Sequence, residues 1–220
     1  MSNSAKGGAK TQSGAAKAQR WGSEVPQRDA QFAAKRMAIL RAAAQMFAGL
    51  GYHETSLNEL ARRLGVSKPA LYYYVKSKDD ILLQCLDVAM QDIRAALADA
   101  EACRKDARQK LKLFVARYVD LLTGDFGKCL VLAGITPLAE EQRQRLAVGY
   151  REIDRAIQKI VAAGLRDGSL ARCDTRMVTF ALFGALHWIT KWYQADGGKT
   201  PAQIAAGLFQ VFELGLKPRA

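Results

Sequence analysis

Apolar residues recur at every third or fourth position through most of the chain, which is the spacing of an amphipathic α-helix. The first stripe begins near Phe32 and ends at Gly49 and Gly51, and turn segments such as Gly197-Gly198 separate the later stripes. No segment shows a convincing alternation of apolar and polar residues, the signal of a β-strand. The pattern predicts an all-α fold of about nine helices.

Three predicted helix starts carry the pattern of a capping box. In this motif a Ser or Thr hydroxyl accepts the backbone N–H of the residue three positions later, and the side chain of that residue accepts the backbone N–H of the Ser or Thr. The three pairs are Ser56 with Glu59, Ser77 with Asp80, and Thr200 with Gln203. The first two boxes bracket a region in which we expect two short helices.

The residues around Gly65 predict a tight turn between these two helices. Gly65 is the residue most easily turned to positive φ. Ser67 is placed to cap the next helix, and Val66 and Leu71 have the spacing of a hydrophobic staple. Such a turn crosses the second helix steeply over the first, so that it can project into the DNA major groove. We therefore expect a helix–turn–helix motif.

The outward side of the second short helix carries side chains suited to DNA. Lys68 can contact phosphate or guanine, and Ala70 is small enough to approach a thymine methyl. Three consecutive tyrosines cannot all face one core, so Tyr72 and Tyr73 are expected outside, where their hydroxyls can donate to phosphates. The alternative is that these tyrosines are partly exposed packing residues.

Residues 55–82, TSLNELARRLGVSKPALYYYVKSKDDIL, resemble the signature of the TetR/AcrR repressor family. The shared pattern is a Thr/Ser cap, an acidic residue three on, Gly-Val-Ser, a Leu-Tyr-aromatic-aromatic run and Lys-Ser-Lys before two acidic residues. Position 75, commonly Phe in that family, is Val here, and position 69, often Gly, is Pro. The resemblance implies a repressor that binds a palindromic operator as a dimer. The residues expected at the DNA are Ser56, Ser67, Lys68, Pro69, Ala70, Tyr72, Tyr73, Lys76 and Lys78.

The last third, GALHWITKWYQADGGKTPAQIAAGLFQVFELGL, resembles family members that govern fatty-acid, acyl-CoA and sterol-type catabolism. This resemblance implies a small hydrophobic or acyl-CoA-type effector; regulation of drug efflux in response to aromatic or cationic compounds is the alternative. The residues expected at the effector are Phe114, Tyr118, Phe183, His187, Trp188, Lys191 and Trp192. Core packing stays open for the aromatic residues. A basic run could clamp acyl-CoA phosphates or be a solvated face: Arg143, Arg145, Arg151, Arg155 and Lys159.

The last two predicted helices are apolar on more than one face, and a helix apolar all round must be buried on all sides. A partner subunit forming a four-helix interface would bury them, and burial within one chain is the alternative. The residues expected at this homodimer interface are Phe180, Leu182, Leu208, Val211 and Phe212.

The formal net charge of +12 is spread along the chain and changes this picture little. Residues 1–30 carry five basic and two acidic side chains (+3), residues 31–87 eight and five (+3), and residues 88–220 twenty and fourteen (+6). Charge alone does not choose among nucleic acid, anionic lipid and an anionic ligand.

Residues 1–30, poor in large aliphatic side chains, predict a disordered basic arm, either inert or in contact with DNA. Residues 31–87 then form the DNA-binding domain, and residues 88–220 the ligand-binding and dimerisation domain.

Other function classes find little support in the sequence. It contains no nucleophile elbow, phosphate-cradling glycine loop or HExxH motif, so we expect no catalytic residues and no cofactor. The four cysteines lack CxxC or Cys/His spacing, which favours free thiols in the cytoplasm and no metal site: Cys85, Cys103, Cys129 and Cys173. No secretory signal or membrane span is expected. An architectural DNA-binding protein is the other alternative, but it would not require so large an apolar C-terminal domain.

Overall fold

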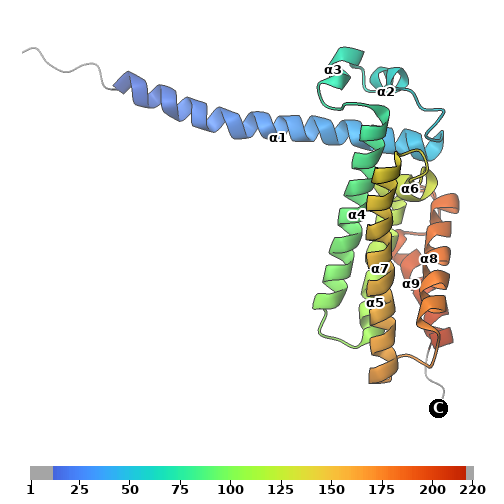
Figure 1. Cartoon of the computed structure of the whole chain (residues 1–220). Helices are drawn as coiled ribbons and strands as arrows, with labels where there is room; N and C mark the ends of the chain where they lie inside the picture. Colours follow the sequence, from blue (N-terminus) through green and yellow to red (C-terminus); the bar gives the residue numbers. More distant parts are fainter. Residues whose placement is uncertain (1–11, 217–220) are drawn as a thin grey trace, which may run out of the picture.

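The computed structural model describes residues 12–216 of the chain, with side chains from residue 28 to residue 215. Over the described residues it contains nine α-helices and no β-strand, which confirms the predicted fold class (Figure 1). The helices are α1 (Gln12–Gly49), α2 (Leu57–Arg63), α3 (Lys68–Tyr72), α4 (Lys78–Ala102), α5 (Ala107–Thr123), α6 (Asp125–Leu132), α7 (Glu140–Asp167), α8 (Thr175–Trp192) and α9 (Pro201–Leu216). None of them is both long and apolar enough to span a membrane.

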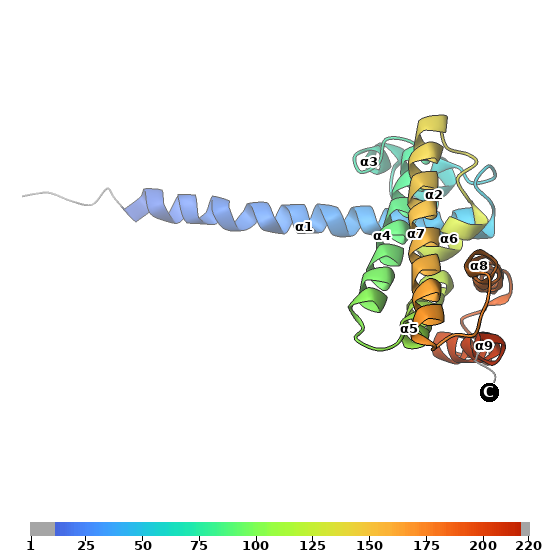
Figure 2. The same ribbon diagram turned by 60° about the horizontal axis from the view of Figure 1, so that its bottom comes forward.

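Helix α5 lies at the centre of the C-terminal part. It packs against α4, α6, α7, α8 and α9, and its apolar stripe is fully enclosed: Leu111, Phe114, Val115 and Leu122 are all at most 1% exposed. In Figure 2, α4 and α7 run side by side over α5, and α8 and α9 lie beyond it. The amphipathic pattern of the sequence thus becomes one core built around a central helix.

The short helices α2 and α3 sit at one end of α4, next to the C-terminal half of α1 (Figure 1). One apolar core runs through this end and the C-terminal part, because α4 belongs to both and contributes buried residues along its whole length. The predicted boundary at residue 87 therefore falls inside a continuous helix. The two functional regions are parts of one packed body.

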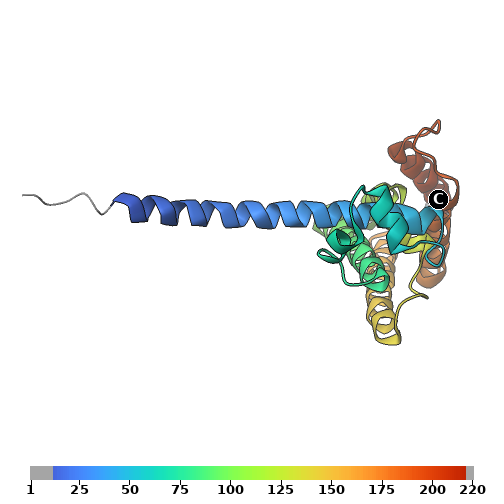
Figure 3. The same ribbon diagram turned by 90° about the horizontal axis from the view of Figure 1, so that it is seen from above.

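The N-terminal arm differs from its prediction. Residues 12–30 continue α1 as helix, which extends away from the body in Figure 3, whereas a disordered segment was expected. Alanine, glutamine, lysine and arginine favour helix, whereas Gly14, Gly22 and Pro26 disfavour it. Lengthening an existing helix avoids the cost of nucleating a new one, which favours continuation of α1. Residues 1–11 of the predicted arm lie outside the described residues.

Candidate nucleic-acid interface and ligand cavity

The turn between α2 and α3 is built by backbone hydrogen bonds around one glycine. Gly65 has φ +65°, and its N–H donates to the Arg62 carbonyl at 3.1 Å. The Val66 N–H donates to the Ala61 carbonyl at 3.0 Å. These two bonds define a Schellman motif, which satisfies carbonyls at the helix end and reverses the chain. Val66 is 41% exposed and Leu71 fully buried, so this motif, and not the predicted staple, fixes the turn.

Helix α3 begins at the predicted cap. The Ser67 hydroxyl accepts the Ala70 N–H at 3.3 Å, and Leu71 anchors the helix in the core. The opposite side is open to solvent: Tyr72 is 47% and Tyr73 72% exposed. The predicted contact residues Ser67, Lys68, Pro69, Ala70, Tyr72, Tyr73 and Lys76 are all exposed on or beside this helix, and Ser56 is exposed at the start of α2. These exposed residues belong to α2, α3 and the segment after α3, at the end of the molecule where Figure 1 places the two short helices.

Phe32 of α1 packs against Tyr73 and Tyr74, whereas the sequence analysis placed it only in the apolar stripe of the first helix. The Phe32 ring lies edge-on to Tyr73 at 5.6 Å and 4.9 Å from the Tyr74 ring. Tyr73 and Tyr74 are themselves 5.1 Å apart and perpendicular. Aromatic pairs at these distances attract one another beyond simple burial. Phe32 therefore fixes the orientation of an exposed tyrosine that it does not adjoin in sequence.

Lys78, predicted to contact DNA, is already engaged within the chain. Its Nζ donates to the His53 carbonyl at 3.2 Å and lies 4.2 Å from the centre of the Tyr52 ring. The Tyr52 hydroxyl in turn donates to Asp79, and burial, with that bond, raises the Tyr52 pKa. These contacts fasten the loop after α1 to the first turn of α4, and Lys78 is half-buried.

Two of the three predicted capping boxes form only in part. Ser56 accepts the Glu59 N–H, but the Glu59 carboxylate pairs with Arg62 and does not return to Ser56. Ser77 likewise accepts from Asp80, whose carboxylate accepts the Lys76 N–H. In each case the carboxylate accepts a hydrogen bond from a different donor. The box of Thr200 and Gln203 is complete, with bonds of 3.3 and 2.9 Å.

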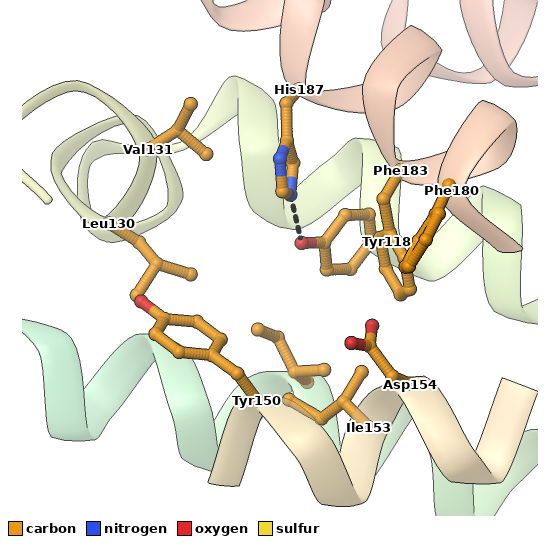
Figure 4. Close-up of a pocket in the computed structure, with 10 residues that line it drawn as sticks. Tyr118, Leu130, Val131, Tyr150, Ile153, Asp154, Phe180, Phe183 and His187 are labelled. Atoms are coloured by element: carbon orange, nitrogen blue, oxygen red, sulfur yellow. Dashed lines mark hydrogen bonds between the residues drawn. The ribbon is translucent and has the colours of Figure 1, made fainter. Parts of the chain in front are cut away.

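The C-terminal part contains a partly open cavity of about 380 Å³ between α4, α5, α6, α7 and α8 (Figure 4). This volume lies in the usual range for small-molecule sites, roughly 300–1,000 Å³. The walls are mostly apolar and aromatic, with a few polar groups: Ile93, Tyr118, Leu130, Val131, Tyr150, Ile153, Asp154, Phe180, Phe183 and His187.

A hydrogen bond of 2.8 Å joins the Tyr118 hydroxyl to Nε2 of His187 at the cavity wall. Burial, and then the charges of Tyr150 and Asp154, raise the pKa of Tyr118. Burial lowers the pKa of His187 and raises that of Tyr150 to about 12. At neutral pH these side chains are uncharged hydrogen-bonding groups. Asp154 is the acidic group of the cavity, and burial raises its pKa.

The predicted effector residues divide into two sets. Tyr118, Phe183 and His187 line the cavity, and Phe114 stacks behind Tyr118 at 5.3 Å. The other three lie on the outer face of α8, where Trp188 is 65% and Trp192 47% exposed and Lys191 is also exposed, so they do not line this cavity. Tyr150 and Asp154 also line the cavity, and neither was among the predicted effector residues.

The predicted dimer residues differ in how accessible they are on the protomer. Val211 is exposed, whereas Leu182 is 1% exposed, inside the protomer. Leu208 and Phe212 are half-buried against the core, and Phe180 is partly exposed at the cavity. The exposed apolar residues of α8 and α9 fall on one face of each helix: Met177, Phe180, Trp188, Trp192, Val211 and Leu214. This face, which we call the α8–α9 patch, includes the two tryptophans assigned above to the effector.

The predicted basic run lies outside the cavity lining. Arg143 pairs with Glu140, and Arg145 donates to both Asp87 carboxylate oxygens at 2.9 Å. The other three members, Arg151, Arg155 and Lys159, are exposed along α7. Within the part of the chain that the structure describes, no group of His, Cys, Asp or Glu is arranged to bind a metal ion.

Two protein-family models match the chain, and together they cover most of the described structure. Residues 39–85 match bacterial regulatory proteins of the tetR family, and residues 104–216 match the tetracyclin repressor-like C-terminal domain. The first match spans the end of α1 through α3 and the start of α4, and the second begins just before α5 and ends at the last residue of α9.

Relatives with curated names are transcriptional regulators. The chain is 27% identical over 169 residues to the fatty acid metabolism regulator protein of Bacillus subtilis, covering 74% of this chain and 85% of that protein. It is 29% identical to the HTH-type transcriptional regulator RutR of Escherichia coli K12, over 74% of each protein.

Solved structures share the fold. PfmR, a TetR family regulator from Thermus thermophilus, superposes with a TM-score of 0.73 at 27% identity, over 82% of this chain and 99% of its own. AibR, crystallised with isovaleryl coenzyme A and operator DNA, gives a TM-score of 0.72 at 22% identity, over 80% and 96%. The helix–turn–helix surface, the helical cavity and both family matches agree, and the chain belongs to the TetR family of bacterial regulatory proteins.

Proposed function

We propose that the chain is a repressor that binds a palindromic operator as a homodimer and is released by a small, largely hydrophobic effector. The observation that carries this proposal is the pairing, within one packed body, of an exposed α3 surface with a largely apolar, partly open cavity. A DNA surface alone would suit an architectural protein. The cavity adds a place where a ligand can shift the equilibrium between two states.

The dimer brings two copies of α3 to the operator. The residues of the α8–α9 patch are apolar and exposed on the protomer, and exposed apolar residues gathered on helix faces mark an interface. Pairing two copies through the patch makes a four-helix contact. Each α3 then enters one major groove, and the two grooves lie about one helical turn apart. Lys68 and Tyr72 contribute contacts to base edges and phosphates.

Helix α6 links the cavity to the DNA end. Leu130 and Val131 of α6 line the cavity, and the same helix packs against α1 and α4. A ligand that displaces α6 therefore moves the helices on which α2 and α3 rest. Because packed interfaces switch between discrete arrangements, a small shift of α6 changes the spacing of the two α3 helices. The ligand acts only through its different affinity for the two states.

Two effector chemistries have support. An acyl-CoA or fatty-acid effector is supported by the Bacillus subtilis relative, and exposed Arg151 and Arg155 could meet phosphates outside the cavity. An aromatic or cationic effector, as in regulation of drug efflux, is supported by the aromatic walls and by Asp154. In both cases the apolar body of the effector fills the cavity.

The DNA-binding proposal is tested with the double variant Lys68→Ala, Tyr72→Ala and a duplex that the wild-type protein selects from a random library. We expect loss of gel retardation at moderate salt, with the dimer unchanged in size-exclusion chromatography. Lys105→Ala removes the same charge in the exposed loop between α4 and α5 and should bind normally. Retardation by the double variant would refute the role of α3. Selection of no preferred sequence would favour an architectural protein.

A further inference from the structure

We propose that the cavity takes a ligand with an apolar, aromatic body and a protonated amine, and that the amine pairs with the carboxylate of Asp154. This inference rests on the proposed function, since it names the effector class of the same cavity. It differs from an acyl-CoA or fatty-acid effector in the sign of the charge that enters the site.

The charges of the lining residues favour a cation. Asp154 is the acidic residue among the ten that line the cavity, and none of the ten is lysine or arginine. His187 does not replace them, because burial lowers its pKa and keeps the imidazole neutral. A carboxylate ligand would therefore bring a second negative charge beside Asp154 with no cation in the lining to compensate.

Asp154 itself lacks a compensating partner. It forms no ion pair or hydrogen bond with another side chain in the described part of the chain, and its side chain is half-buried. In Figure 4 its carboxylate points from α7 toward the rings of Tyr118 and Phe180. A partly desolvated carboxylate is stabilised by a nearby positive charge. An ammonium group entering the cavity supplies that charge and donates hydrogen bonds to the carboxylate oxygens.

Aromatic rings surround the position that the ammonium would occupy. Tyr118, Tyr150, Phe180 and Phe183 come from three helices and line the same cavity. The faces of aromatic rings attract cations, and this attraction grows when the site is desolvated. The same rings provide the apolar surface that an aromatic ligand body needs, so one cavity suits both halves of the ligand.

The cationic side chains of α7 and α8 lie outside the cavity lining. Arg176 sits 5.3 Å from the Phe180 ring, and Arg151 and Arg155 are exposed on α7 to either side of Asp154 in sequence. These cations could attract an anion to the outside of the molecule. They do not line the cavity, so they do not offset Asp154 for a charge that enters it. The test must therefore compare ligands that differ only in the head group.

The experiment uses 4-phenylbutylamine, 4-phenyl-1-butanol and 4-phenylbutanoate, which share one apolar body and carry a positive, neutral and negative head group at pH 7.5. Dissociation constants are measured by isothermal titration with wild-type protein, with Asp154→Asn and with Glu141→Gln. Glu141 is an exposed acidic residue on the same helix, so its variant controls for the loss of one negative charge.

We expect the wild-type protein to bind the amine at least about 10-fold more tightly than the carboxylate, the size expected for a hydrogen-bonded charge pair. Asp154→Asn should weaken binding of the amine about 10-fold and change the dissociation constant of the alcohol by no more than about 2-fold, because only the amine pairs with the carboxylate charge. Glu141→Gln should bind all three ligands as the wild type does.

Three results would overturn the inference: a carboxylate bound as tightly as the amine, an amine affinity unchanged in Asp154→Asn, or no binding of any of the three compounds. The wild-type comparison needs no variant, so it stands even if Asp154→Asn folds poorly. Retardation of the selected duplex by ligand-free protein is measured in parallel. If the ligand-free protein does not retard the duplex, the proposed function is refuted, whereas a wrong charge preference would refute only the assignment of the ligand.

Discussion

The Tyr118 hydroxyl and Nε2 of His187 lie 2.8 Å apart, and this hydrogen bond joins α5 to α8 across the wall of the cavity. Both side chains are largely buried, and Phe183 lies within 6 Å of each ring. The bond therefore satisfies two polar atoms that would otherwise face an apolar space. It also fixes the distance between two of the helices that enclose the cavity.

Removing either partner should destabilise the protein. Tyr118→Phe leaves the ring in place but deprives the His187 nitrogen of its partner, which costs about 1–3 kcal/mol for a buried group. A double-mutant cycle with His187→Phe, measured by urea unfolding, should give a coupling energy of about 1 kcal/mol between the two positions. Strict additivity of the two substitutions would show that the bond does not contribute to stability.

Protonation of His187 should contribute to the pH dependence of the free energy of unfolding. Burial lowers its pKa in the folded state, whereas in the unfolded chain the pKa is about 6.5. Between these two values the unfolded chain binds more protons, so the free energy of unfolding falls as the pH drops below about 6.5.

His187→Asn should reduce this loss of stability, which urea unfolding at pH 7.5, 6.5 and 5.5 would show as a smaller slope. Asp92 and Asp154, whose pKa values burial raises, act with the opposite sign, but they are present in both proteins and cancel in the comparison. Equal slopes in the two proteins would contradict the assignment.

The helix–turn–helix could be predicted from the sequence because its signals are local. Gly65, Ser67 and Ser77 each act on backbone groups within three or four residues, and the structure places each at a helix end. The side chains of Glu59 and Asp80 were predicted less well. Their partners depend on which donor lies closest in space, and a pattern of residue types does not contain that distance.

The cavity could be predicted only in part, because five helices contribute one to three residues each. Tyr118 and His187 lie among the buried apolar residues of α5 and α8, and the sequence prediction included both. Asp154 was missed, although an acidic residue between the buried Ile153 and Ile157 on α7 was a visible signal. Trp188 and Trp192 were assigned to the effector because apolar periodicity does not distinguish a face turned inward from one exposed on the protomer surface.

The turn at Gly65 should tolerate no other residue without cost. A Cβ there would meet nothing within 4 Å, so the penalty of Gly65→Ala comes from the backbone alone, at φ +65°. We expect a loss of about 1–2 kcal/mol in the free energy of unfolding. Gly49→Ala, at the end of α1 with equally open surroundings and no positive φ, should cost nothing or stabilise slightly. Equal effects of the two variants would refute the argument.

Adding a single methyl group to α6 at Gly127 should destabilise the protein. A Cβ on Gly127 would lie 2.1 Å from the Leu121 carbonyl oxygen and 2.6 Å from its carbon, and these backbone atoms of α5 do not give way easily. We expect Gly127→Ala to destabilise the protein by about 1–3 kcal/mol or more, as overpacking does. In whatever folded protein remains, α6 is displaced away from α5; because α6 packs against α1 and α4, the affinity for the selected duplex should change as well. Unaltered unfolding and DNA binding would show that α5 and α6 separate freely.

Substitution of Phe32 tests whether α1 contributes to DNA binding by orienting a tyrosine at the end of α3. Its ring packs against Tyr73 and Tyr74, and Tyr73 is mostly exposed, so Phe32→Ala frees an outward side chain that must be ordered again on binding. Aromatic pairs contribute about 0.5–1.5 kcal/mol, which corresponds to a loss of about 2- to 10-fold in affinity for the selected duplex. Met37→Ala, a similarly exposed residue of the same helix, is the control and should bind normally. Tyr73→Ala should remove the effect of Phe32→Ala, because the ring that Phe32 orients is then absent. If Phe32→Ala weakens binding equally with and without Tyr73, Phe32 acts by another route, such as a direct contact with DNA.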